Sequence, residues 1–73
     1  MKIGDIIKQG LRVRAILKEK GLSAMQLHRK TGIDDARIYN ILGGKTEMSA
    51  GEVTEIAKAL NVEYEQILDE YKI

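Results

Sequence analysis

The sequence predicts an all-α fold of five helices joined by short turns. Along most of the 73 residues, apolar side chains recur three and four positions apart, which places them on one face of a helix. No segment alternates apolar and polar residues over the length of a strand, and the chain contains no proline. A chain of this length forms at most one domain, so we expect residues 1–73 to fold as a single unit.

The first helix is expected over residues 3–20. Gly10 weakens its middle by about 1 kcal/mol relative to alanine, so the segment is either one long helix or two pieces hinged at Gly10. Gly21 supplies a C-terminal stop, because glycine adopts the left-handed conformation without strain. The apolar stripe of this segment consists of Ile3, Ile6, Ile7, Val13, Ile16 and Leu17.

Two short helices follow, and each begins with a residue that can cap a helix. Ser23 with Gln26 three positions later is the capping-box pattern, and Gly32 ends this second helix at a tight turn. Asp34 is a suitable N-cap for a third helix that runs to about Leu42. The expected apolar residues of the two helices are Ala24 or Met25, Leu27, Ile38, Ile41 and Leu42.

The last part of the chain predicts two more helices. Ser49 and Glu52 form a second capping box, and Asn61 is a residue that tolerates the left-handed backbone at a helix end. A fifth helix is expected from about Glu63. The apolar faces consist of Val53, Ile56, Ala57 and Leu60 in the fourth helix and Tyr64, Ile67, Leu68 and Tyr71 in the fifth.

The composition argues against several classes of function. The chain has no cysteine and one histidine, His28, so we expect no metal cluster and no nucleophile–base pair. The run Gly43-Gly44-Lys45-Thr46 lacks the first glycine and the preceding strand of a phosphate-binding loop. No apolar run approaches the roughly 20 residues of a membrane span, and no signal-peptide core is present. We therefore expect a cytoplasmic protein that is not an enzyme and that binds no membrane, cofactor or small-molecule ligand.

The net charge of +1 conceals an uneven distribution of charge. Residues 1–30 carry eight lysines and arginines against two acids, whereas residues 46–73 carry two lysines against seven acids. Such asymmetry is typical of a nucleic-acid-binding face with an acidic back. Head-to-tail self-association or a mixed solvated surface produces the same pattern, so charge alone leaves the partner open.

Between residues 11 and 68 the order and spacing of these features resemble the Cro and phage-repressor helix-turn-helix family, of the xenobiotic-response-element type. The corner Gly21-Leu22-Ser23, the turn Thr31-Gly32-Ile33 and the whole segment 49–68 lie at the family's spacing. The resemblance implies a five-helix repressor-like DNA-binding domain whose helix-turn-helix occupies residues 23–42. It also implies that the second helix crosses the phosphate backbone and that the third enters the major groove of double-stranded DNA.

The resemblance and the side-chain chemistry together indicate a DNA interface. Asn40 can form two hydrogen bonds with adenine, and Tyr39 can place its ring on a thymine methyl or its hydroxyl on a phosphate. The carboxylate of Asp35 is repelled by the DNA backbone unless it accepts a hydrogen bond from cytosine. Arg37 either reaches phosphate or guanine, or pairs with Asp34 three residues earlier. The candidate DNA-binding residues are Ala24, Asp35, Ala36, Arg37, Tyr39, Asn40, Lys45 and Thr46.

Three positions depart from the family pattern. Many members pair an arginine near the end of the first helix with a glutamate near the end of the third, and the corresponding residues here are Leu17 and Leu42. We expect these leucines to touch, because an apolar pair can replace a buried ion pair without loss of stability. His28 occupies a position usually held by alanine, where we expect a partly buried, hydrogen-bonded side chain.

Two functional hypotheses follow. The first is sequence-specific double-stranded DNA binding by a small transcriptional regulator, such as a repressor of phage or mobile-element type, acting as a homodimer. The second is a protein-interaction module of the same fold, such as an antirepressor with a protein partner, in which Tyr39, Asn40 and Lys45 are structural or solvated and DNA binding is weak or lost. Residues 1–10 extend the first helix beyond the family match, and they either cover the domain's own core or form a dimer surface; the fifth helix is the alternative dimer surface.

Overall fold

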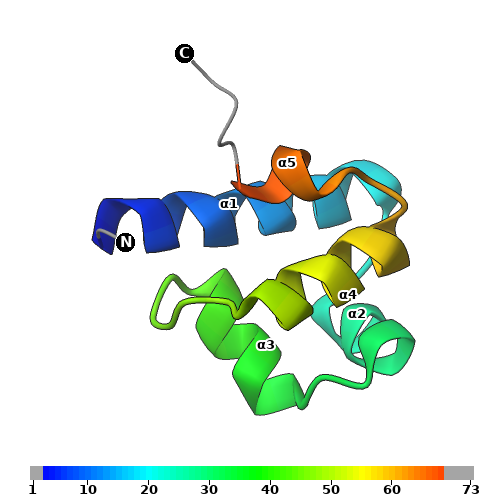
Figure 1. The fold of residues 1–73 in the computed structure, drawn as a ribbon. Coiled ribbons are helices and arrows are strands. Elements are labelled where there is room, and N and C mark those ends of the chain that lie inside the picture. The colour runs from blue at the N-terminus through cyan, green and yellow to red at the C-terminus, as the bar shows by residue number, and fades with distance from the viewer. Residues whose placement is uncertain (1–2, 69–73) are drawn as a thin grey trace.

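The computed structural model describes residues 3–68 of the chain, with only the backbone of Ile3 included. Within this range the chain forms five α-helices (Figure 1). They are α1 (Ile3–Lys20), α2 (Ala24–Thr31), α3 (Asp35–Leu42), α4 (Ala50–Leu60) and α5 (Tyr64–Leu68). The expectations for the side chains of Ile3 and Tyr71, and for the charges of Lys2, Asp69, Glu70 and Lys72, lie outside the described residues.

The helices are arranged in two groups, which are joined by α4 and by direct packing of α1 against α3. In Figure 1, α1 and α5 lie side by side at the top of the molecule, and α2 and α3 lie at the bottom. The packing agrees with this view: α4 contacts both α2 and α5, and α1 contacts α5 on one side and α3 on the other. Over residues 3–68, no helix is both long and apolar enough to cross a membrane.

The helix ends follow the local capping chemistry that the sequence predicts. Both capping boxes are formed: the hydroxyls of Ser23 and Ser49 each accept a hydrogen bond from the backbone amide three positions later, and the serine backbone amides donate to the side-chain oxygen of that same residue. Asp34 caps α3 through a hydrogen bond from the amide of Ala36. Asn61 ends α4 with a φ of 57°, in the left-handed region, as expected.

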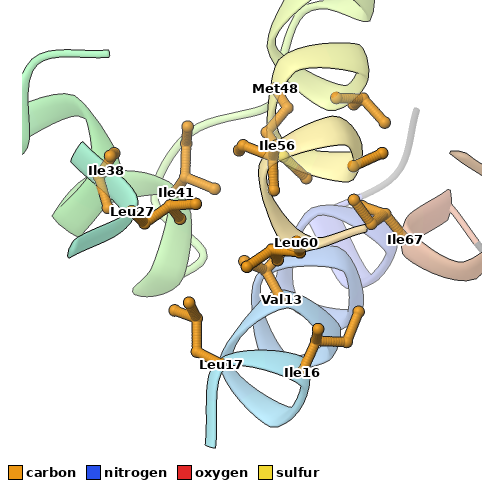
Figure 2. Close-up of a cluster of buried hydrophobic side chains, with 12 residues drawn as sticks. Val13, Ile16, Leu17, Leu27, Ile38, Ile41, Met48, Ile56, Leu60 and Ile67 are labelled. Carbon is orange, nitrogen blue, oxygen red and sulfur yellow. The ribbon is translucent and has the colours of Figure 1, made fainter. Parts of the chain in front are cut away.

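Buried apolar side chains from all five helices meet in one core, to which Met48 of the α3–α4 loop also contributes (Figure 2). Leu17 is buried in this core, and Leu42 is partly buried against it. Both leucines therefore belong to the apolar interior, and a direct contact between their side chains stays a prediction. The fully buried side chains are Val13, Leu27, Ile38, Ile41, Val53, Ile56, Leu60 and Ile67.

Gly10 does not hinge the first helix, because α1 is continuous from Ile3 to Lys20. A Cβ atom at Gly10 would clash with the carbonyl oxygen of Ile41 and would stand 3.3 Å from that of Leu42. Glycine at this position therefore lets the backbone of α1 approach the C-terminal end of α3. One turn earlier, the side chain of Ile7 lies against Gly44 yet remains 44% exposed, so Ile7 contributes to both the fold and the surface.

Candidate nucleic-acid interface

The turn between α2 and α3 is a short segment held by local hydrogen bonds. Gly32 has a φ of 77°, and its amide donates to the carbonyl of His28. The Thr31 hydroxyl donates to the carbonyl of Leu27 and accepts from the amide of Ile33, at 2.8 and 3.1 Å. These bonds fix the direction in which the chain enters α3.

His28 adds a further contact across the same turn. Its side chain is partly buried, and its Nδ1 lies 2.5 Å from the carbonyl oxygen of Ile33. A carbonyl accepts, so Nδ1 carries the proton and donates. The predicted partly buried, hydrogen-bonded histidine is therefore confirmed.

Helix α3 has an inner face that packs on the core and an outer face that is exposed to solvent. Ile38 and Ile41 are buried in the core, where they anchor the helix. Tyr39 is 58% exposed, so its ring does not pack into the interior, and the side chain of Asn40 is also exposed. The exposed residues of α3 are Asp35, Ala36, Tyr39 and Asn40, which are four of the predicted contacts. They form a continuous solvent-facing surface of mixed chemistry on one short helix.

Two other predicted contacts lie outside α3. Ala24 is the first residue of α2 and is partly buried against the core, so it offers little besides a methyl group and the helix start. Lys45 is exposed in the loop after α3, and its backbone amide donates to the carbonyl of Asn40. Gly44, just before it, has a φ of 71°, which glycine adopts readily.

Arg37 is the predicted contact whose position differs most from expectation. Its guanidinium points toward the start of α4, where it forms a two-pronged ion pair with the carboxylate of Glu52, with both N–O distances 2.7 Å. It also donates to the hydroxyl of Thr46 and to the carbonyl of Glu47, each at 2.9 Å. The alternative pairing with Asp34 is therefore wrong, because Glu52 is the acidic partner and Asp34 caps α3.

Glu52 is the residue of this region that sequence reasoning missed, since it was assigned only a capping role. Its hydrogen bonds from Arg37, more than any other contact, lower the pKa of Glu52 from 4.5 to about 2. The same hydrogen bonds raise the pKa of Arg37. Arg37 and Glu52 lie 15 positions apart, so no pattern of helical spacing could have revealed the pair.

Comparison with known protein families identifies the type of fold. A family model of the Cro/C1-type helix-turn-helix DNA-binding domain matches residues 12–71. The chain belongs to this family. The predicted resemblance and the predicted five-helix fold are thus both confirmed.

Among solved structures, this chain is similar to the restriction-modification controller protein C.AhdI from Aeromonas hydrophila. The two share 28% sequence identity with a TM-score of 0.84, and the match covers 88% of this chain and 97% of that one. Among curated protein sequences, none matches this chain. Within residues 3–68, no group of three or more histidine, aspartate or glutamate side chains is placed to hold a metal ion.

Proposed function

We propose that this Cro/C1-type protein is a cytoplasmic transcription regulator that binds double-stranded DNA sequence-specifically as a homodimer. The observation that carries the proposal is the exposed outer face of α3, with Tyr39 and Asn40 at its centre, on a helix whose inner face is anchored in the core. A short helix held rigidly on one side and exposed on the other is suited to insertion into the major groove. The similar controller protein supports a regulatory role, of a mobile-element or restriction-modification type.

In this proposal the exposed residues have separate roles. Asn40 reads a base edge, and Tyr39 contacts a thymine methyl or a phosphate. Lys45 contacts the phosphate backbone, which contributes affinity without sequence information. Asp35 either accepts a hydrogen bond from a cytosine amino group or weakens binding by repulsion, and Ala36 allows close approach of the helix.

One feature favours a second candidate function, a protein-interaction module with weak or lost DNA binding. Asp34 and Asp35 place two carboxylates at the start of α3, and both side chains are exposed. Two negative charges at this end of the helix would be repelled by DNA phosphates but would attract a basic protein surface. The two candidates differ in whether the protein binds DNA at low salt.

The test is a fluorescence-anisotropy titration of the protein with a random-sequence duplex and then with duplexes selected from a random library. For the proposed function, we expect affinity to fall as salt rises, and Lys45→Ala to lower the slope of log K against log salt by about 0.9. Lys58→Ala is a matched control, because Lys58 is exposed in the last turn of α4, at the end of that helix opposite the loop that carries Lys45. We expect it to leave the slope unchanged.

Two further variants address base reading and repulsion. Asn40→Ala is expected to cost about 1–3 kcal/mol on the selected sequence and almost nothing on random DNA. Asp35→Asn is expected to strengthen binding to random DNA by removing a negative charge. Absence of binding by the wild type at low salt would reject the DNA-binding proposal in favour of the interaction module.

A further inference from the structure

Arg37 occupies a junction between three segments of the chain. It leaves the middle of α3 and reaches the first turn of α4 through Glu52, and it reaches the loop through Thr46 and Glu47. The side chains of Arg37 and Glu52 are 36% and 19% exposed. Glu52 is therefore largely shielded from solvent, whereas the side chain of Arg37 is only partly shielded.

The guanidinium of Arg37 cannot hold these contacts and serve DNA equally well. A guanidinium has five N–H donors, and four hydrogen bonds to protein oxygens already occupy most of them. A bidentate contact to guanine or phosphate would need the same fork of donors that Glu52 holds. A bidentate contact between Arg37 and DNA would thus require the ion pair to break.

We propose that Arg37 is a positioning residue rather than a DNA contact: together with Glu52 it ties α3 to α4 and fixes the loop that presents Lys45. The proposal rests on the DNA-binding function proposed above. The hydroxyl of Thr46 and the carbonyl of Glu47 both accept hydrogen bonds from Arg37, so the tie holds the loop on either side of the Thr46–Glu47 peptide bond.

Glu52 makes the tie stronger than a single pair would be. One of its oxygens, Oε1, accepts from Arg37 and also from the backbone amide of Ser49, at 2.7 and 2.8 Å. The carboxylate therefore joins the capped start of α4 directly to α3. Isolated surface ion pairs contribute little to stability because both side chains lose conformational freedom when they pair. In a two-pronged pair within a hydrogen-bonded network, other hydrogen bonds already hold the side chains in place, so this cost is smaller.

The substitution Glu52→Gln separates the two roles by the sign of its effect. Glutamine keeps an oxygen for the amide of Ser49, so the capping box survives and only the ion pair is removed. If Arg37 positions the loop, Glu52→Gln and Arg37→Gln both weaken binding to the selected duplex, by about tenfold, with the salt slope unchanged. If Arg37 contacts phosphate and Glu52 merely restrains it, Glu52→Gln strengthens binding and Arg37→Gln lowers the slope by about 0.9. This second pattern would overturn the proposal.

A second measurement tests the tie without DNA. The amides of Gly44 and Lys45 donate to the carbonyls of Ile41 and Asn40, so their hydrogen exchange reports the order of the loop. We expect exchange at both amides to be about tenfold faster in Glu52→Gln and Arg37→Gln, whereas the amide of Val13, buried in α1, should remain much more slowly exchanging than either as a control for intact folding. Unchanged exchange at Gly44 and Lys45 would overturn the tie. Failure of the wild type to bind any duplex would reject the proposed function and leave this exchange result valid.

Discussion

The two turns that flank α3 are held in place by contacts of very different range. The turn before α3 depends on neighbours in sequence: Thr31 with Leu27 and Ile33, and His28 with Ile33, all within five residues. The loop after α3 has local backbone hydrogen bonds as well, but its side-chain and packing contacts are made with distant segments. There, Arg37 binds Glu52 across 15 residues, and the backbone of α1 at Gly10 packs against the end of α3.

Because of this difference, we expect the two ends of α3 to differ in how strongly substitutions affect them. Short-range hydrogen bonds cost little entropy to form, because the chain already holds their partners close together. Long-range contacts form only when the whole fold is assembled. They are therefore the first contacts to be weakened by a change that disturbs packing between helices. We therefore expect substitutions to lower the free energy of unfolding most at the loop after α3 (the second turn) and less at the turn before α3 (the first turn).

Gly10→Ala is the strongest test of the long-range contacts at the end of α3. Helix propensity alone predicts that alanine stabilises α1 by about 1 kcal/mol. The new Cβ would meet the carbonyl of Ile41, so we expect instead a loss of about 1–3 kcal/mol in the free energy of unfolding, measured by urea denaturation. Gly4→Ala is the matched control, since a Cβ there meets no atom within 4 Å. Equal results for the two variants would show that α1 and α3 are not in close contact at Gly10.

Acid should weaken the second turn through Glu52. A carboxyl whose pKa is lower in the folded state stabilises the protein fully above its unfolded pKa and loses this contribution as pH falls through the folded value. For Glu52 that window runs from about pH 4.5 down to about 2. We expect the wild type to lose roughly 1–2 kcal/mol more than Glu52→Gln across this window, a figure that allows for solvent screening at the partly exposed Arg37. Parallel losses in urea titrations of the two proteins would contradict the assignment.

The first turn should respond more weakly. His28→Ala removes the hydrogen bond to Ile33, and Thr31→Val removes the hydroxyl that bridges Leu27 and Ile33. Each is expected to lower the free energy of unfolding by about 1 kcal/mol. Arg29→Ala, an exposed neighbour on the same helix, is expected to change it by less than about 0.5 kcal/mol. Losses at His28 larger than that at Gly10 would reverse the proposed ranking of the two turns.

The smallest effect is expected at the cap of α3. Asp34→Ala removes an exposed 3.2 Å hydrogen bond to the amide of Ala36 and should cost about 0.5–1 kcal/mol in thermal or urea unfolding. Asp34→Asn keeps a side-chain oxygen for that amide, so its stability should lie close to that of the wild type. A loss from Asp34→Asn equal to that from Asp34→Ala would show that charge, rather than capping, accounts for the effect.

The same division of range explains which features could be predicted from the sequence. Ser23, Asp34, Ser49 and Asn61 act on their own backbone neighbourhood, so their roles as caps followed from residue type and spacing and are confirmed. The family resemblance implied outward positions for Tyr39 and Asn40, and both side chains are exposed, although their contacts with DNA stay predictions.

The features that the sequence did not reveal are those that need the assembled fold. Gly10 was interpreted as a weak point or hinge, because its close neighbour Ile41 lies 31 residues away in the chain. Arg37 was assigned to DNA or to Asp34, because only the packing of α4 against the rest brings Glu52 within reach. Position 52 carried a visible signal, a glutamate in a capping box, but that signal accounted for only one of its two functions.

The residues that hold α3 in place and the residues that it presents to solvent are different sets. Ile38, Ile41 and Arg37 face the protein, whereas the side chains of Tyr39 and Asn40 are exposed to solvent. Changes on the outer face can therefore accumulate without altering the angle at which the helix is offered. Under the proposed function, one or two substitutions on this single helix would be enough to change the DNA sequence that is bound, and a new set of outward side chains could be grafted onto the same scaffold.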